Sequence, residues 1–247
     1  MIGERLDAER RASLDQALAT YYTRPEGRAG FKGFYKRLIE DGDDVIAKLL
    51  TPFATGSLRH LLSDEGADLL ADEALITVFD LRLLEPDLRP AAAMVCSETV
   101  WAAAARNPKP RVLVVDEVWS IMQHPEGAAF MVSMAKRARK HQLGLQFITQ
   151  DVQDLLSDDP TRIITGHSGR ALLQNAAFKL LLQQDAAAVA TVGEAFDLPE
   201  ELQRWLLSCP RGDGLLLTRG SRYPIRIEAT AEEADIVEYR PWRYADS

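Results

Sequence analysis

The sequence is poor in residues that form covalent or metal cross-links. Its 247 residues include two cysteines, Cys96 and Cys209, and four histidines. The histidines stand at positions 60, 124, 141 and 167, without the spacing of metal ligands. A disulfide framework and a zinc site are therefore both disfavoured, and a reducing cytoplasm is the expected location.

Long apolar runs are also missing. No run approaches the roughly 18 apolar residues that a membrane-spanning helix needs. Residues 1–11 are charged and lack the apolar centre of a signal peptide, so no leader is expected. With 47% hydrophobic and 27% charged residues, the composition is that of an ordinary globular protein. The length allows one sizeable domain, alone or with a smaller appendage.

A surplus of positive charge is absent. The 29 Lys and Arg residues are outnumbered by 37 Asp and Glu residues, which gives a formal net charge of −8. Non-specific affinity for nucleic acid usually rests on an excess of Lys and Arg. DNA is therefore not indicated as a partner by charge, although residues 136–140 (KRARK) form a local basic run.

The string of a phosphate-binding loop, G-x-x-x-x-G-K-[ST], does not occur in this sequence. In such a loop, backbone N–H groups surround the phosphates and the Lys neutralises them. The glycine-bearing stretches at residues 27–32 and 166–170 have the wrong spacing. Strong independent binding of ATP is therefore not expected of this chain.

The chain divides near residue 72 into parts of different character. Before it, apolar residues follow a helical period and no stretch resembles a strand. The predicted elements are helices over residues 6–21, 31–38 and 44–50, and a further apolar segment at 58–62. The third helix is expected to stop at Thr51 because Pro52 disfavours helix in the residue before it. Residues 1–72 are thus predicted to form an all-α subdomain.

After residue 72, strands and helices alternate. The predicted strands are residues 75–81, 111–115 and 144–149, separated by helices over 90–106 and 125–141. Their alternation predicts parallel strands covered on both faces. The remaining predictions are a short strand at 171–174, helices over 187–196 and 199–207, and a hairpin of 214–218 with 223–229. We therefore predict an α/β domain over residues 73–240 and a tail over 241–247.

Two carboxylates follow the apolar strand of residues 111–115. In open α/β sheets, ligands bind outside the carboxyl ends of the strands. Asp116 there is suited to hold a magnesium ion that bridges nucleotide phosphates, and Glu117 to orient and deprotonate a water molecule. The alternative is that Asp116 caps the next segment and Glu117 is merely exposed.

Gln150 ends the next predicted strand. Its amide is suited to sense a γ-phosphate or hold the attacking water. Alternatively, Gln150 simply begins a helix. One helix separates the two strand ends, which is the spacing of neighbouring strands in a right-handed crossover.

The basic run at residues 136–140 admits two interpretations. As a solvated turn, it complements the dipole of the helix that it ends. As a functional element, it carries an arginine that could reach the γ-phosphate of a neighbouring subunit. Trp119, close to the carboxylates, is interpreted as packing that anchors the loop after the strand.

Together these segments resemble the large ATPase of conjugative type IV secretion systems, in the HerA–FtsK class of hexameric pumping motors. The resemblance rests first on VVDEVW (residues 114–119), KRARK (136–140) and TQDVQDL (149–155). Further similar segments are TGSL (55–58), VFDL (78–81), FDL (196–198) and GDGLL (212–216).

The resemblance implies a RecA-like P-loop core, partial because the Walker A strand is absent, with an all-α insertion. It implies that Asp116 and Glu117 are the Walker B pair, that Gln150 is the sensor, and that Arg139, or failing it Arg137, is the arginine finger. It also implies ATP with magnesium and assembly into a homo-hexamer. Contact with other secretion-system components at the inner membrane is implied as well.

In that family the phosphate loop precedes the helical insertion, so this chain resembles the C-terminal part of such a motor. We expect this chain to be inactive alone. The intact motor of which it is a part is expected to couple ATP hydrolysis to substrate transfer or pilus assembly. Two alternatives stay open. One is a non-catalytic interaction module with the same fold, and the other is a fragment of a HerA/FtsK-like DNA translocase.

Overall fold

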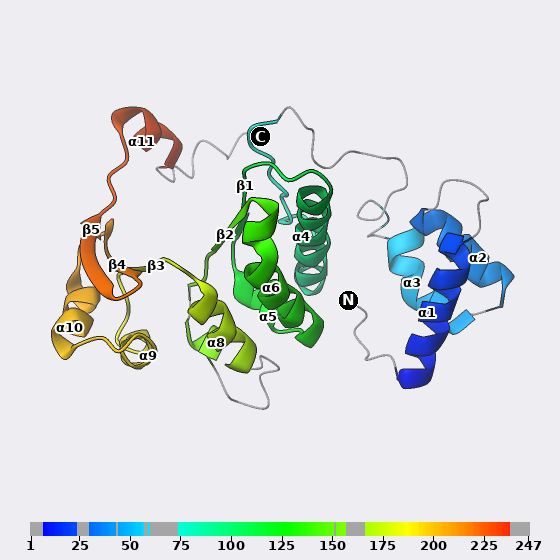
Figure 1. Cartoon of the computed structure of the whole chain (residues 1–247), viewed down its shortest axis with the longest axis horizontal. Helices are drawn as coiled ribbons and strands as arrows, with labels where there is room; N and C mark the ends of the chain where they lie inside the picture. Colours follow the sequence, from blue (N-terminus) through cyan, green and yellow to red (C-terminus); the bar gives the residue numbers. More distant parts are fainter. Residues whose placement is uncertain are drawn as a thin grey trace. The chain divides into compact units, whose positions relative to one another are not determined.

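A computed structural model describes residues 7–23, 30–42, 44–56, 59, 74–150, 152–156 and 166–237 of the chain. The chain forms two compact units, coloured along the sequence in Figure 1. The first unit is Met1–Leu113 with His141–Leu143, and the second is Val114–Lys140 with Gly144–Ser247. The boundary expected near residue 72 stays a prediction, because residues 60–73 lie outside the described part.

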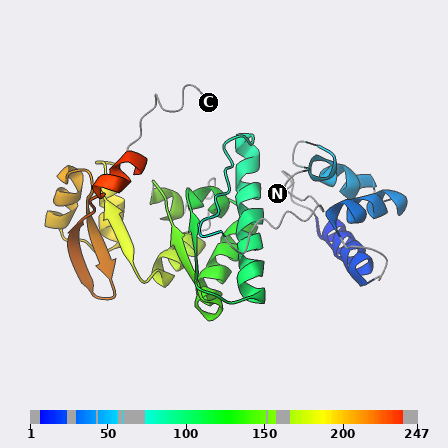
Figure 2. The ribbon, with the colours of Figure 1, turned by 90° about the horizontal axis from the view of Figure 1, so that it is seen from above.

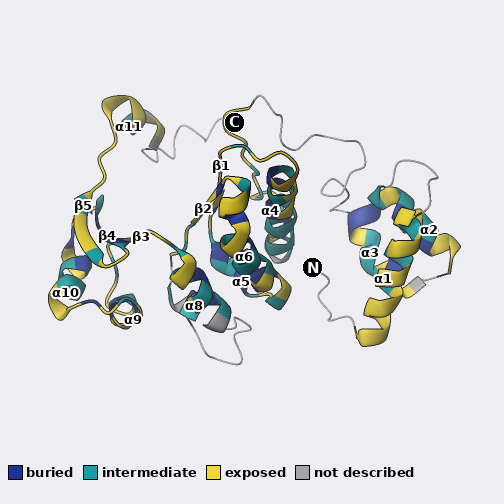
Figure 3. Ribbon diagram, in the orientation of Figure 1, coloured by how far each residue is buried: buried dark blue, intermediate teal, exposed yellow. Residues whose placement is uncertain are grey.

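The first unit begins with three helices. They are α1 (Ala8–Thr23), α2 (Phe31–Glu40) and α3 (Asp44–Ala54). Phe34 and Leu38 from α2 pack with Ile46 from α3 in a small apolar core, against which one side of α1 lies half-buried. No residue of α1 is fully buried, and Figure 3 shows exposed positions along it.

These helices agree with the sequence predictions except at the end of α3. This helix continues past Pro52 to Ala54 instead of stopping at Thr51. Pro52 has no N–H to donate to the carbonyl four residues before it. The amides of Thr55 and Gly56 nevertheless both donate to the carbonyl of Thr51 at 3.0 Å, so the helical turn closes beyond the proline. The apolar segment predicted at 58–62 lies outside the described residues apart from residue 59.

The prediction of a strand over residues 75–81 is wrong. This segment forms no strand, and Leu75, Ile76 and Val78 are 101%, 83% and 79% exposed. Its β-branched residues favour an extended backbone but do not supply the hydrogen-bonding neighbour that a strand requires. At its end, Nε and Nη2 of Arg82 donate hydrogen bonds to the two carboxylate oxygens of Asp80 and hold the pKa of that carboxyl at about 2.

A 3₁₀ turn, η1 (Pro86–Leu88), leads into the long helix α4 (Arg89–Arg106), which confirms the helix predicted over 90–106. The described helices include none with both the length and the apolar character needed to cross a membrane.

Strands β1 (Arg111–Val115) and β2 (Leu143–Phe147) form a two-stranded sheet. The amide of Arg111 donates to the carbonyl of Gln142 at 3.1 Å, and the amide of Ile148 donates to the carbonyl of Val115 at 2.9 Å. Residue numbers therefore rise in the same direction along both strands, so the pair is parallel, as predicted.

One face of β1 differs from the prediction. Leu113 and Val115 are buried, but Val112 and Val114 are 69% and 51% exposed. An uninterrupted apolar run favoured burial on both faces. Among the described residues, only the face that carries Leu113 and Val115 is covered.

Between these strands the chain forms α5 (Val118–Met122), α6 (Pro125–Arg137) and the 3₁₀ turn η2 (Ala138–His141). The single helix predicted over 125–141 thus ends in a tighter turn. Val118, Ile121 and Met122 of α5 are almost fully buried, as are Met131 and Met134 of α6. This rigid apolar layer fixes the segment that directly follows β1.

After β2 come α7 (Gln153–Leu156) and α8 (Gly166–Asn175). The short strand predicted at 171–174 is wrong because these residues belong to α8. Its Ala-Leu-Leu-Gln string consists of strong helix formers. The glycine at 169, which lacked the context of a phosphate loop, instead lies where α8 meets α7.

Gly169 allows a close approach between these helices. A Cβ atom added there would overlap the carbonyl oxygen of Leu155 and lie 3.2 Å from its Cα. Backbone atoms cannot turn aside, so we expect Gly169→Ala to destabilise the second unit by about 1–3 kcal/mol in thermal unfolding. Gln174→Ala, at an exposed position on the same helix, should change stability little. A Gly169→Ala chain that melts higher, as helix propensity alone predicts, would contradict this packing.

The second unit ends in an antiparallel sheet with the order β3-β4-β5. Strands β4 (Asp213–Thr218) and β5 (Ser221–Arg226) confirm the predicted hairpin, whereas β3 (Lys179–Leu182) was not predicted. Helices α9 (Ala188–Ala195) and α10 (Glu200–Ser208) confirm their predictions. They cover one face of this sheet (Figure 1; Figure 2). A final short helix is α11 (Ala231–Val237).

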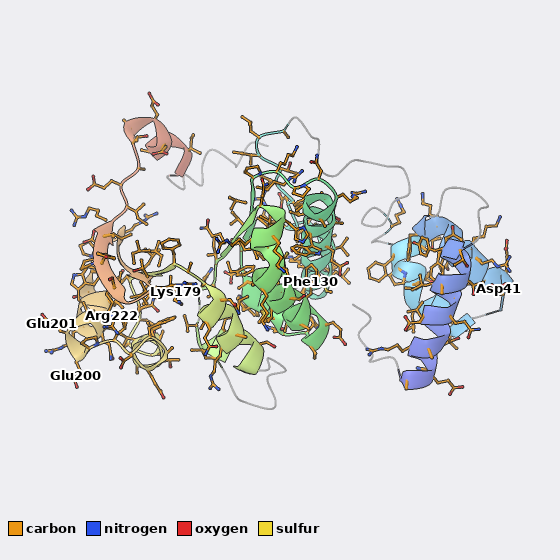
Figure 4. All side chains as sticks on the ribbon, viewed as in Figure 1. Asp41, Phe130, Lys179, Glu200, Glu201 and Arg222 are labelled. Atoms are coloured by element: carbon orange, nitrogen blue, oxygen red, sulfur yellow. The ribbon has the colours of Figure 1, made fainter. Side chains whose placement is uncertain are left out.

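Two arginines of β5 bind aspartates in FDL (residues 196–198) and GDGLL (residues 212–216), two of the segments that resemble the type IV secretion ATPase. Arg222, labelled in Figure 4, donates to the backbone carbonyl of Asp197 at 2.6 Å. Arg226 donates to both carboxylate oxygens of its cross-strand partner Asp213, at 2.6 and 3.0 Å. In the described structure these aspartates therefore stabilise the turn after α9 and the hairpin.

The Asp213–Arg226 pair predicts a pH effect. Its hydrogen bonds favour the charged carboxylate, so the pKa of Asp213 lies below its usual 3.8. A lowered pKa in the folded state stabilises the fold above the unfolded pKa, and this contribution disappears as the pH falls through the folded pKa. The free energy of unfolding of wild type should therefore exceed that of Arg226→Gln most at neutral pH. The difference should shrink as the pH falls below the usual pKa of an Asp side chain.

Urea unfolding at neutral pH and at about pH 3 tests this expectation. Arg219→Gln, in the adjoining turn, removes the same charge from an exposed position without touching Asp213 and serves as the control. If the wild-type and Arg226→Gln midpoints shift equally between the two pH values, the pair carries no pH-dependent stability.

Candidate functional site

The candidate site lies at the carboxyl ends of the parallel strands β1 and β2. Asp116 directly follows β1, and Gln150 follows β2 by three residues. The amide of Val118 donates to the carbonyl of Ile148 at 3.1 Å, which continues the pairing beyond both strands. This continuation brings the two predicted segments together at one edge of the sheet.

Glu117 has an unusual backbone conformation. Its φ and ψ angles of 49° and 47° lie in the left-handed region, immediately before α5. This region costs a residue other than glycine roughly 1–2 kcal/mol. The Glu117 amide donates to Oδ1 of Asp116 at 3.0 Å, so the first carboxylate supports the turn that carries the second.

Both carboxylate oxygens of Glu117 accept hydrogen bonds. Nε2 of Gln150 donates to Oε1 at 2.6 Å, across a separation of 33 residues in sequence. The indole Nε1 of Trp119 donates to Oε2. Such bonds to a charged acceptor are stronger than neutral ones. Three side chains therefore form one connected group at the sheet edge.

Sequence reasoning missed the part that Trp119 plays in this group. Its interpretation as packing accounts for its half-buried ring but not for its N–H donor. The only indication in the sequence was its position two residues after Glu117, which does not show the direction of either side chain.

Asp116 fits the expected magnesium ligand in chemical type. It is exposed, and Oδ1 accepts the Glu117 amide, while the described residues offer no hydrogen bond to its other oxygen. Magnesium retains several waters and takes one or two carboxylates in nucleotide sites. One free carboxylate oxygen beside a strand end is compatible with that arrangement.

Arg139 lies away from this group within its own chain. It belongs to η2, just before β2 begins, whereas Gln150 follows the end of β2. The five residues of β2 separate the two edges by about 16 Å, at roughly 3.3 Å per residue. Arg139 and Arg137 are both exposed. The structure therefore brings together three of the four predicted site residues and leaves the arginine at the opposite edge.

Comparisons with known proteins give the family of the chain. The family model of the TraG P-loop domain matches residues 39–214, more than half of the chain, and includes all four predicted site residues. Curated protein sequences give no significant match.

Among solved structures, this chain is similar to VirB4 of Thermoanaerobacter pseudethanolicus, with a TM-score of 0.78 and 27% sequence identity. The similarity covers 92% of this chain and 66% of the VirB4 chain. This chain therefore matches about two thirds of the length of that relative. The fold is an α/β P-loop core of the RecA-like type, and the chain belongs to the family of TraG P-loop domains.

Proposed function

We propose that the chain is the hydrolysing part of an ATP-driven motor of type IV secretion or conjugation, which couples ATP hydrolysis to substrate transfer or pilus assembly. The observation that carries this proposal is the contact between Glu117 and Gln150 at the carboxyl ends of β1 and β2. It places a carboxylate beside an amide donor where α/β sheets bind ligands.

In this proposal each residue of the site has a distinct task. Asp116 would hold the magnesium ion, which neutralises phosphate charge when it is bound. Glu117 orients the attacking water and accepts its proton. Gln150 senses the γ-phosphate through its amide.

Arg139 acts on the nucleotide of a neighbouring subunit, with Arg137 as the second candidate. Its distance from Glu117 of its own chain supports action between subunits. This assignment requires an oligomer, for which a homo-hexamer is proposed. The proposed assembly lies in the cytoplasm and contacts other secretion components at the inner membrane.

Because no phosphate-binding string occurs in the sequence, activity is proposed to require a phosphate loop outside these residues. The test is to read the coding sequence upstream of Met1 and to assay the longer product for magnesium-dependent ATP hydrolysis. A strand followed by G-x-x-x-x-G-K-[ST], together with turnover, supports the motor. Unrelated upstream DNA would favour a non-catalytic interaction module with the same fold.

A further inference from the structure

The two hydrogen-bond donors that hold Glu117 differ in how firmly they are fixed. Trp119 belongs to α5, where its neighbours Val118 and Ile121 are 0% and 1% exposed. Trp119 itself is half-buried, and its N–H donates to Glu117 from two residues away, on a helix that these buried neighbours hold in place. Gln150 is exposed in the segment after β2, and its amide can turn toward solvent or a ligand.

The chemistry of the donors differs as well. An indole N–H only donates, so Trp119 offers nothing to a water proton or a metal ion. An amide both donates and accepts, so Gln150 can exchange one partner for another. A carboxylate only accepts, which requires Nε2 of Gln150 to face Glu117.

We infer that Trp119 is the positioning residue of Glu117: its indole N–H fixes one carboxylate oxygen while Gln150 serves as the releasable partner of the other. With both donors in place, neither oxygen is fully free to accept a water proton. When the amide of Gln150 turns to another group, Oε1 becomes available and Trp119 keeps the carboxylate in position. The catalytic consequence rests on the proposed function, whereas the hydrogen-bond arrangement does not.

The indole N–H groups report directly on this arrangement in the chain as it is. Four tryptophans, at positions 101, 119, 205 and 242, give four indole resonances in a ¹H–¹⁵N spectrum. The Trp119 resonance is the one that disappears in Trp119→Phe. A hydrogen bond to a carboxylate moves such a proton downfield.

We expect Glu117→Ala to move the Trp119 resonance upfield by more than any of the other three. Glu194→Ala, which removes an exposed carboxylate from α9, should leave all four in place. Gln150→Ala should shift the Trp119 resonance far less than Glu117→Ala does. A Trp119 resonance unmoved by Glu117→Ala overturns the inference, and so does an equal shift in Gln150→Ala.

In an active motor, Trp119→Phe should lower kcat about 10- to 100-fold and leave KM for ATP nearly unchanged, because a displaced base slows chemistry more than binding. Trp101→Phe, the same change in α4, serves as the control and should leave both constants near wild type. Equal kcat in Trp119→Phe and wild type overturns the positioning role. If a longer chain shows the expected NMR shifts and still lacks ATPase activity, that result would refute the proposed function but would leave the hydrogen-bond arrangement supported.

Discussion

Glu117→Gln is expected to reduce ATP turnover by about 10²–10⁴-fold in a motor that contains this chain and a phosphate loop, because an amide cannot accept the water proton. The substitution keeps the size of the side chain and an oxygen that accepts from Trp119. ATP affinity should therefore stay near wild type while phosphate release falls. Steady-state phosphate release and nucleotide binding, measured on the same preparation, separate the two effects.

Glu126→Gln, in the first turn of α6, makes the same chemical change outside the site and should leave turnover near wild type. Equal phosphate release by Glu117→Gln and wild type would show that Glu117 is not the base. In that event, the contact with Gln150 would be a structural one.

Leu215→Ala is expected to destabilise the β3-β4-β5 sheet by about 2–5 kcal/mol, the cost of leaving a cavity in a packed core. Leu215 is fully buried and packs with Val192 of α9 and Leu206 of α10. Trp205 lies against the same cluster, so its fluorescence follows unfolding of this region. Unfolding in urea gives the change in free energy.

Leu180→Ala provides the control for this substitution. Leu180 lies on the neighbouring strand β3, but its side chain is 43% exposed and faces away from the helices. Leu180→Ala should lower the free energy of unfolding much less than Leu215→Ala does. Similar costs at both positions would mean that α9 and α10 do not enclose the core described for this sheet.

The proximity of the candidate residues was predictable from sequence where chain spacing determines the geometry. An apolar strand ending in Asp116 and Glu117, one helix, and a strand ending near Gln150 predict neighbouring parallel strands. The hydrogen bond between Glu117 and Gln150 agrees with that prediction. The roles of these residues, and that of Arg139, stay predictions.

Features that depend on contacts between distant segments were not predictable. Residues 75–81 have the composition of a strand, but no neighbour pairs with them in the described structure. Conversely, β3 is only four residues long, and its pairing with β4 joins segments more than 30 residues apart. The left-handed turn at Glu117 and the hydrogen bond from Trp119 to that residue were likewise indicated by no local pattern.

We propose that this chain carries the hydrolysing half of a nucleotide site without the phosphate-binding half. Steady-state phosphate release by the purified chain with ATP and magnesium tests it most directly. We expect phosphate release at the level of buffer alone, for wild type and for Glu117→Gln alike. Release by the wild-type chain that disappears in Glu117→Gln would contradict it, because the chain would then bind and hydrolyse ATP unaided.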